Sequence, residues 1–276
     1  MINLIFKKII KKNIRFKDIY KDQECYIIGN GSSLKRYDLN LFSNKKIITC
    51  NWMLLHKDFK KLKNVVAYIA CSPFWFAPFK KHPYSRKIEY NRSNNIFFRN
   101  FKGIEIPLFT SITNIFFLKN INKVLLHDFK LKEINLDYNL LHEKFSLLRG
   151  AFYAMLGIAS YMGFKKIFLV GLDYWMSDPL MGHFYEKDFS KRKEAAEANY
   201  SIKNQKHKED QDFIDQINQK MDVKMLCPQN YDSNLFESIS YQDFFKVKEN
   251  FKKNNEIVSH DNLSDLSKLN WKYEIF

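Results

Sequence analysis

The sequence has little glycine, proline or cysteine, and it lacks long apolar runs. Eight glycines and six prolines among 276 residues exclude collagen-like and proline-rich architectures. No uninterrupted apolar run approaches the roughly 20 residues that a membrane-spanning helix needs. The N-terminus does not combine a charged start, an apolar segment and a small-residue cleavage site, so we expect no secretory signal. Hydrophobic residues make up 46% and charged residues 27%, an ordinary globular composition that excludes wholesale disorder. The length of 276 residues suits one large domain or one domain with a small appendage.

The four cysteines form no recognisable metal or disulfide framework. Cys25, Cys50, Cys71 and Cys227 lie far apart, without a CxxC pair or histidines at zinc-like spacing. Three of them lie in or beside apolar runs that resemble strands. We therefore expect small buried side chains in a reducing, cytoplasmic compartment, and no metal site. A single disulfide is the minor alternative.

Acidic residues are in the minority. The chain has 45 basic and 30 acidic residues, for a net charge of +15, and only seven of the basic residues are arginine. A basic surface attracts polyanions: nucleic acid, anionic lipid or phosphorylated small molecules. Because readers of base edges depend on arginine and no nucleic-acid-binding motif is present, we expect no nucleic-acid partner. The codon bias of an AT-rich genome is the simplest explanation of the lysine excess, and attraction to an anionic membrane surface is the next.

The N-terminal segment alternates apolar residues and lysines at helical spacing. Residues 2–19 (INLIFKKIIKKNIRFKDI) predict a basic helix that occupies residues 1–20. Such a helix can lie on an anionic membrane as an amphipathic anchor. The alternative is an ordinary leading helix packed on the domain.

The rest of the chain alternates apolar strand-like runs with helices. This alternation predicts an α/β fold: a Rossmann-like, doubly wound, mostly parallel sheet over 21–245, with a helical or irregular lid insertion at about 176–207 and a tail at 246–276. The segment 80–145 is aromatic and basic and predicts short elements without clear bounds. The predicted strands are 24–29, 45–51, 64–72, 165–175 and 223–230, and the predicted helices are 146–163 and about 209–221.

Small polar residues follow the predicted strands. Ligands of parallel sheets bind at the carboxyl ends of the strands, so these residues predict a shared cleft. The turn after the first strand matches neither GxGxxG nor a phosphate-binding P-loop, although its glycines would let a phosphate approach the backbone. Asp173 could bind a sugar hydroxyl, act as a base or cap a helix. The candidates at strand ends are Gly29, Asn30, Gly31, Ser32, Ser33, Asn51, Ser72 and Asp173.

Two histidines in the polar insertion are candidate general bases. His183 lies in GHFYE and His207 in KNQKHKED. A histidine titrates near neutral pH and can accept a proton from an attacking hydroxyl. Tyr185 or Tyr200 could donate a hydrogen bond to a departing phosphate.

The segments IIGNGSSL, TCN, ACSPFWF, GFKKIFLVGLDY and LCPQN occur in an order that resembles the bacterial sialyltransferases of glycosyltransferase family 42. The chain also resembles the MptE-like domain, named for a hydroxymethylpterin pyrophosphokinase, which often carries a strand ending in GLD followed by GHFYE. The resemblance covers about residues 24–245, apart from the poorly aligned middle.

The sialyltransferase resemblance implies a Rossmann-like fold, a CMP-activated nonulosonic acid as donor, no metal or other cofactor, and inverting displacement with a histidine base. By position, Asn30, Gly31 and Ser33 match the phosphate-side loop and Asn51 the nucleotide-contacting asparagine. Asp173 matches the aspartate at a strand end. His207 is nearest to the place of the family's catalytic histidine, whereas His183 matches the MptE-like motif.

Three positions depart from the family pattern. Ser72 stands where the family has a further asparagine. Gly150 follows Arg149 where the family has a serine before glycine. Trp175 replaces a tyrosine that supports the leaving phosphate. These departures weaken the implied identity of the donor.

Three functions remain open from the sequence. The first is a sialyltransferase-like glycosyltransferase that builds lipopolysaccharide or capsule in the cytoplasm, peripheral to the inner membrane face, with a glycan or glycolipid acceptor. The second is a pyrophosphokinase using ATP and Mg²⁺, which would need several aspartates in the cleft. The third is a non-catalytic nucleotide-binding protein of glycan assembly. A homo-oligomer is compatible with each.

Overall fold

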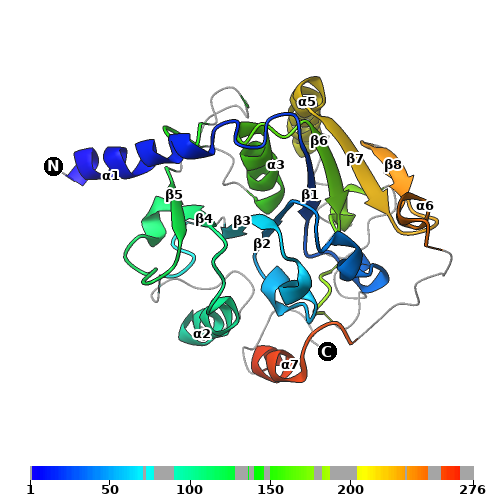
Figure 1. Ribbon diagram of the computed structural model, residues 1–276, viewed down its shortest axis with the longest axis horizontal. Helices are drawn as coiled ribbons and strands as arrows, with labels where there is room; N and C mark the ends of the chain where they lie inside the picture. The colour runs from blue at the N-terminus through cyan, green and yellow to red at the C-terminus, as the bar shows by residue number, and fades with distance from the viewer. Residues whose placement is uncertain are drawn as a thin grey trace.

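A single parallel sheet of eight strands lies at the centre of the computed structural model, in the order β5-β4-β3-β2-β1-β6-β7-β8 (Figure 1). Every neighbouring pair is parallel. This confirms the predicted Rossmann-like α/β fold. The strands are β1 (Glu24–Ile28), β2 (Ile47–Cys50), β3 (Val65–Ala70), β4 (Leu108–Ser111), β5 (Lys123–Leu126), β6 (Lys166–Val170), β7 (Asp222–Cys227) and β8 (Glu237–Ser240).

The structure describes residues 2–70, 73–77, 90–127, 136, 140–145, 150–176, 182–186, 204–233, 235–247 and 256–267. The α-helices are α1 (Ile2–Lys11), α2 (Tyr90–Phe101), α3 (Ala151–Tyr161), α5 (Asn204–Lys220), α6 (Tyr241–Phe245) and α7 (His260–Ser267). Short 3₁₀ helices are η1 (Lys12–Phe16), η2 (Ser32–Arg36), η3 (Leu39–Phe42), η4 (Met53–Leu55), η5 (Phe59–Lys61), η6 (Ile112–Asn114) and η8 (Asp173–Trp175).

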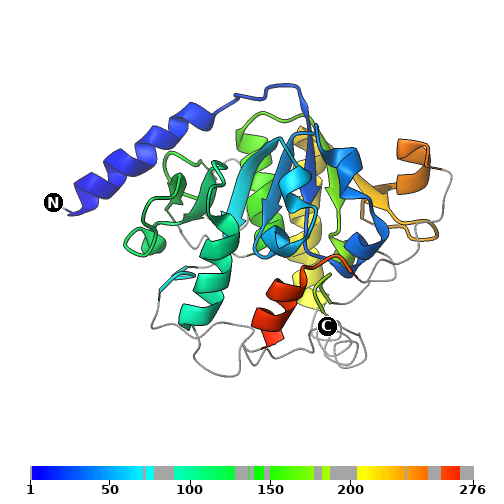
Figure 2. The ribbon, with the colours of Figure 1, turned by 60° about the horizontal axis from the view of Figure 1, so that its bottom comes forward.

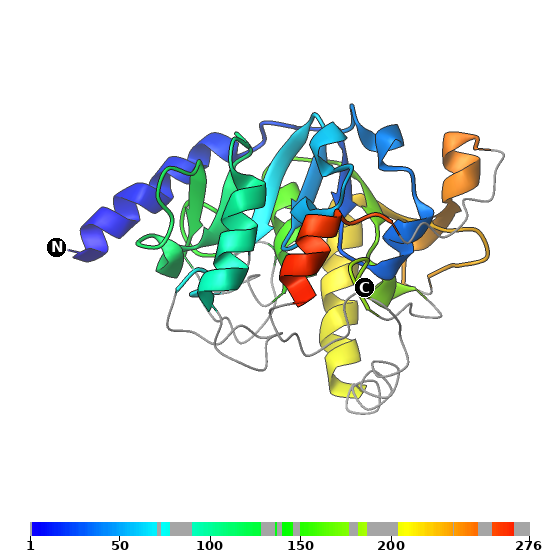
Figure 3. The same ribbon diagram turned by 90° about the horizontal axis from the view of Figure 1, so that it is seen from below.

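Both faces of the sheet are covered. In β1, Cys25 and Ile27 face the core that contains α3, whereas Tyr26 and Ile28 face the opposite core. A strand buried on both faces is apolar at consecutive positions, which explains the run CYII. Helices α3 and α5 lie on one side of the sheet and α2 and α7 on the other, as the view from below shows (Figures 1 and 3).

The cysteines that the structure describes behave as predicted. Cys25, Cys50 and Cys227 are buried free thiols at or near strand ends. Burial raises the pKa of the Cys227 thiol to about 11, so it stays protonated near neutral pH. Cys71 lies outside the described residues.

The N-terminal helix is shorter than the predicted 2–19. Helix α1 ends at Lys11, and η1 then brings the chain into the body. There the buried Asn13 side chain donates hydrogen bonds to the carbonyl oxygens of Leu125 (2.8 Å) and Leu141 (2.9 Å). The start of α1 extends away from the sheet (Figures 1 and 2). Among the described residues, we find no helix with both the length and the apolar content required to cross a membrane.

Helix α5 begins at Asn204, inside the segment predicted as a lid insertion. The last residues of the predicted helical or irregular lid, which extended to about residue 207, are thus helical, and α5 begins before the helix predicted at about 209–221. Residues 177–181 and 187–203 of the insertion lie outside the described part of the chain.

Candidate functional site

The order of the sheet reverses between β1 and β6, because the chain leaves β1 toward β2 and returns on its other side as β6. Ligands of open α/β sheets bind beyond the carboxyl ends of the strands at such a reversal. The loops after the two strands are in contact here. The Gly29 N–H donates to the Val170 carbonyl oxygen and the Gly31 N–H to that of Gly171, each at 2.8 Å. A Cβ atom at position 29 would lie 2.5 Å from the Gly171 carbonyl oxygen, so this close approach requires glycine.

The carboxylate of Asp173 is buried at the start of η2. It accepts hydrogen bonds from the Ser33 N–H (2.6 Å), the Ser33 hydroxyl and the Ser32 hydroxyl (3.2 Å). Burial raises the pKa of Asp173 to about 6 even though these hydrogen bonds favour the charged form. These hydrogen bonds therefore connect the loop after β1 to η8, the short helix that follows β6. The N–H and the hydroxyl of Ser33 both donate to Asp173, and the contact of Ser33 with a phosphate stays a prediction.

Asn30 and Asn51, at the ends of β1 and β2, each carry a side-chain oxygen that accepts no hydrogen bond from the described residues. The Asn30 amide nitrogen donates to the Cys50 carbonyl oxygen at 3.1 Å, which places Asn30 beside the end of β2. Among the described residues, no donor reaches the buried Oδ1 atoms of Asn30 and Asn51. Buried polar atoms are almost always paired in native proteins. These two oxygens therefore indicate a site for a ligand that carries N–H or O–H donors.

The backbone of Asn51 is fixed from two sides. Its N–H donates to the Ile69 carbonyl oxygen at 2.8 Å, and its own carbonyl oxygen accepts from the Tyr68 hydroxyl at 2.6 Å. Its φ angle of 51° lies in the left-handed region, which asparagine adopts more readily than most residues. The backbone that carries the asparagine side chain is thus fixed at the end of β2.

His183 lies beside this loop and is oriented by Glu186. Gly31 and His183 form an antiparallel bridge, and the Phe184 N–H donates to the Asn30 carbonyl oxygen at 3.0 Å. The His183 Nδ1 atom is 2.7 Å from Glu186 Oε1. When Nδ1 donates to this carboxylate, Nε2 carries the lone pair and can accept a proton. The His183 side chain is 22% exposed and that of Glu186 only 7%, so the histidine is the more accessible member of the pair.

A buried lysine also contacts the loop that carries His183 and Glu186. Lys35, in η2, is 1% exposed and donates from Nζ to the Glu186 carbonyl oxygen at 2.9 Å. The ring of Tyr185 stacks on that of His183, with centroids 5.0 Å apart and an interplanar angle of 6°. Tyr185, predicted to donate to a phosphate, is itself almost fully buried. Its stacking on His183 is a contact that the sequence did not indicate.

Two further predicted residues lie beside helix α3. Trp175 lies in the core, with its ring centroid 4.6 Å from that of Phe152. Gly150 is the residue before α3, at its N-cap. Ser72 and Tyr200 lie outside the described residues. His207 lies within α5, and its side chain is outside the described part. The structure brings together Asn30, Gly31, Ser32, Ser33, Asn51, Asp173, His183 and Tyr185.

Sequence reasoning missed the roles of Glu186, Lys35 and His56. The spacing of three residues between His183 and Glu186 was the available signal for that pair. His56 follows η4 and its ring centroid lies 5.5 Å from that of Phe184. It is 3% exposed and burial lowers its pKa to about 4, so its ring is neutral near pH 7. Its buried Nε2 atom also has no hydrogen-bond partner in the part of the chain that the structure describes.

In the described part of the chain, no group of three or more His, Cys, Asp or Glu side chains is arranged to hold a metal ion.

Neither a scan against protein-family models nor a search of curated proteins gives a match. Among solved structures, the chain is similar to the MAf glycosyltransferase from Magnetospirillum magneticum AMB-1, with 11% identity and a TM-score of 0.44. That similarity covers 96% of this chain but only 42% of the MAf chain.

The chain is also similar to two sialyltransferases from Campylobacter jejuni. CstII, solved with the substrate analogue CMP-3FNeuAc, is 18% identical with a TM-score of 0.42, over 90% of this chain and 99% of that one. The monofunctional alpha-2,3-sialyltransferase Cst-I is 19% identical with a TM-score of 0.38, over 90% and 92% of the two chains.

Proposed function

We propose that this protein is a glycosyltransferase that transfers a nonulosonic acid from a CMP-activated donor to a glycan acceptor. The observation that carries the proposal has two parts. The buried amide oxygens of Asn30 and Asn51, at the ends of neighbouring strands, receive no hydrogen bond from the described residues. The loop of Asn30 also contacts the loop that carries the His183–Glu186 pair. The sequence resemblance to family 42 sialyltransferases supplies the substrate class.

The nucleotide would lie beyond the ends of β1 and β2. A cytosine amino group and ribose hydroxyls are donors of the kind that the Asn30 and Asn51 oxygens lack. The contacts of Asp173 with Ser32 and Ser33 would hold the loop that carries Asn30. Asp173 thus acts on the site through the loop, and we assign it a positioning role.

His183 would act as the general base. Its Nε2 atom would remove the proton of the acceptor hydroxyl while that oxygen forms a bond to the anomeric carbon of the donor. The bond from this carbon to the phosphate oxygen breaks, and CMP leaves with the electron pair. Glu186 would stabilise the imidazolium that forms, as a carboxylate on Nδ1 does in other histidine bases. General-base catalysis of this kind typically contributes about 10²–10⁴ in rate.

A nucleotide screen tests the proposed donor class. Thermal unfolding is followed with CMP, CDP, UDP, GDP and ATP, each with and without Mg²⁺. A ligand at about 100 times its Kd stabilises the folded state by roughly 2.7 kcal/mol, so binding raises the midpoint measurably. We expect selective stabilisation by CMP without a need for Mg²⁺. Selective stabilisation by ATP with Mg²⁺ would favour the pyrophosphokinase instead.

Turnover separates the enzyme from a binding protein. A CMP-nonulosonic acid donor is incubated with the protein and a panel of glycan acceptors, and transferred sugar is measured. CMP binding without transfer to any acceptor would support the non-catalytic alternative. Separate His183→Ala and His207→Ala variants then identify the base, since only one of them should lose most of the turnover.

We also propose that α1 attaches the protein to an anionic membrane surface. Leu4 and Ile5 are 64% and 55% exposed. Exposed lysines surround them on the same helix: Lys7, Lys8 and Lys11, followed by Lys12. Exposed apolar side chains among lysines are the pattern of an interfacial helix that binds anionic lipid. A lipid-linked acceptor at the inner membrane face would then be close to the site.

A further inference from the structure

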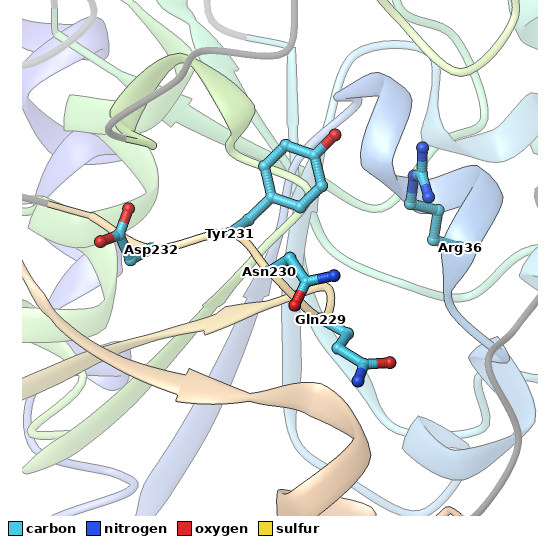
Figure 4. Close-up of a pocket in the computed structure, with 5 residues that line it drawn as sticks. All are labelled: Arg36, Gln229, Asn230, Tyr231 and Asp232. Atoms are coloured by element: carbon cyan, nitrogen blue, oxygen red, sulfur yellow. The ribbon is translucent and has the colours of Figure 1, made fainter.

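A polar pocket lies next to the candidate site, on the side of β7. It has a volume of about 340 Å³ and is lined by Arg36, Gln229, Asn230, Tyr231 and Asp232 (Figure 4). Arg36 ends η2, the helix that follows β1, and the other four residues follow β7. The pocket therefore lies at the carboxyl edge of the sheet, where β6 separates β1 from β7.

Arg36 is held in place from both ends of η2. The start of the helix is fixed by Ser33, whose N–H and hydroxyl donate hydrogen bonds to the Asp173 carboxylate. Its end is fixed by Tyr37, whose hydroxyl donates to the Leu226 carbonyl oxygen of β7 at 2.7 Å. Arg36 is thus presented by a short helix tied to two strands.

Tyr231, the aromatic residue of the pocket, lies in a tight turn after β7. The Tyr231 N–H donates to the Pro228 carbonyl oxygen at 3.1 Å, and Asn230 has a φ angle of 68°, which this turn requires. The Arg36 guanidinium carbon lies 5.7 Å from the centroid of the Tyr231 ring. Cation–π contact of this kind orients the guanidinium and leaves its N–H donors available.

The two charges of the pocket are not paired with each other. Among the described residues, no carboxylate forms an ion pair with Arg36, and Asp232 is not paired with a cation. In Figure 4, Arg36 and Asp232 lie on opposite sides of Tyr231. An arginine recognises a carboxylate or phosphate, whereas a carboxylate accepts hydroxyl hydrogens. A phosphate dianion would be repelled by Asp232, and a carboxylate that carries hydroxyl groups would satisfy both side chains.

We propose that this pocket binds an acidic sugar. The sugar carboxylate would lie against Arg36, its hydroxyl groups near Asp232, Gln229 and Asn230, and its ring beside Tyr231. A volume of this size is at the small end of ligand pockets, which fits a monosaccharide unit. Helix η2 has five residues and a 3₁₀ helix rises about 2 Å per residue, so the backbone of Arg36 lies roughly 10 Å along the helix from that of Gly31, which forms the bridge to His183. The assignment of this pocket to the glycan acceptor rests on the proposed function. The binding of an acidic sugar in the pocket does not depend on it.

Binding of glucuronate, glucose and inorganic phosphate to the full chain tests the proposal, with affinities measured by ligand-detected NMR in the absence of donor. We expect glucuronate to bind at least about tenfold more tightly than glucose, because only glucuronate makes the charged hydrogen bonds to Arg36. Arg36→Gln should weaken glucuronate by a similar factor. Arg15→Gln is the matched control, because Arg15 also lies over an aromatic ring, that of Phe16, outside the pocket.

Variants of Tyr231 and Asp232 test the roles of the aromatic ring and the carboxylate side chain of the pocket. Tyr231→Phe keeps the ring and should bind glucuronate, whereas Tyr231→Ala should not. Asp232→Asn should improve phosphate binding relative to glucuronate. Equal affinities of Arg36→Gln and Arg15→Gln for glucuronate, equal affinities of wild type for glucuronate and glucose, or tighter binding of phosphate than of glucuronate would each overturn the proposal. Stabilisation of Arg36→Gln by CMP is measured in parallel, so loss of nucleotide binding is seen separately from loss of sugar binding.

Discussion

The carboxyl group of Asp173 occupies the space in which residue 31 would otherwise carry a side chain. A Cβ atom on Gly31 would lie 2.4 Å from the Asp173 Cγ atom and 2.5 and 2.6 Å from its two oxygens. The φ angle of Gly31 is −63°, which any residue adopts, so the requirement for glycine comes from this close approach alone. The Asp173 carboxyl group thus accounts for the second glycine of the GNG sequence after β1.

Gly31→Ala should therefore destabilise the fold. The added methyl group would push the Asp173 carboxylate away from Ser33, and overpacking of this kind costs about 1–3 kcal/mol. Urea denaturation measures the loss in the free energy of unfolding. Gly150→Ala is the comparison, because the Cβ of residue 150 would meet the Tyr153 ring at 3.5 Å, an ordinary contact, and only the capping of α3 should weaken. An unchanged free energy of unfolding in Gly31→Ala would show that Asp173 moves aside freely.

Asp173 should also make the stability depend on pH. Its pKa is about 6 in the folded protein and near 3.8 when unfolded, so the folded state binds the proton more tightly. The contribution is fully present below about pH 4 and is lost as the pH rises through 6, by about 3 kcal/mol in total. Asp173→Asn should remove this part of the pH dependence between pH 4 and 7. Parallel curves for the two proteins in urea titrations would contradict the assignment.

The His183–Glu186 pair makes a prediction about turnover. His183→Ala should lower kcat by about 10²–10⁴, because the acceptor hydroxyl loses its base. Glu186→Gln keeps a polar group at Nδ1 but removes the charge that stabilises the imidazolium, so its kcat should lie between those of wild type and His183→Ala. The Kd for CMP should stay the same in both variants. A wild-type kcat in His183→Ala would exclude it as the base and favour His207.

The buried oxygen of Asn51 makes a prediction about nucleotide binding. Asn51→Gly removes the amide but accepts the positive φ angle without strain, so the fold should remain intact. Loss of a buried hydrogen bond should weaken CMP by roughly 0.5–1.5 kcal/mol. Asn120→Gly is the matched control, because Asn120 also has a positive φ angle and lies on another loop. Unchanged CMP affinity in Asn51→Gly would remove Asn51 from the nucleotide site.

The sequence predicted the central strands because they are buried on both faces and are therefore continuously apolar, as in CYII of β1 and KIFLV of β6. It did not delimit β8, whose sequence ESIS is only partly buried at the sheet edge and lacks an apolar run. The loop residues at strand ends were also predicted, because chain order and parallel pairing bring them to one edge. Which of them face each other was not, since Asp173 meets Ser33 across 140 positions of sequence.

The exposed side of α1 makes the prediction about membrane binding. Replacing Leu4 and Ile5 with serine removes apolar area, and burial of one such side chain contributes about 1.5–3 kcal/mol. Replacing Lys7 and Lys8 with glutamine removes about 1 kcal/mol per lysine near an anionic surface. Sedimentation with vesicles of phosphatidylserine and phosphatidylcholine should therefore show weaker binding for both double variants. Deletion of residues 2–19 would be a poor test, because it also removes the buried Asn13 that fastens η1 to the body.

The control for α1 must change the same charge elsewhere on the surface. Lys57 and Lys60 are exposed lysines near η5, and their replacement with glutamine alters the net charge by the same two units. If α1 is the membrane contact, this control should bind vesicles like the wild type, and binding should fall when salt screens the lysines. Equal losses in the two lysine variants would mean that the protein binds lipid through its overall positive charge. Wild-type vesicle binding by the Leu4 and Ile5 double variant would show that α1 does not insert, and a change in its oligomeric state would make a second copy of the chain the occupant of this surface.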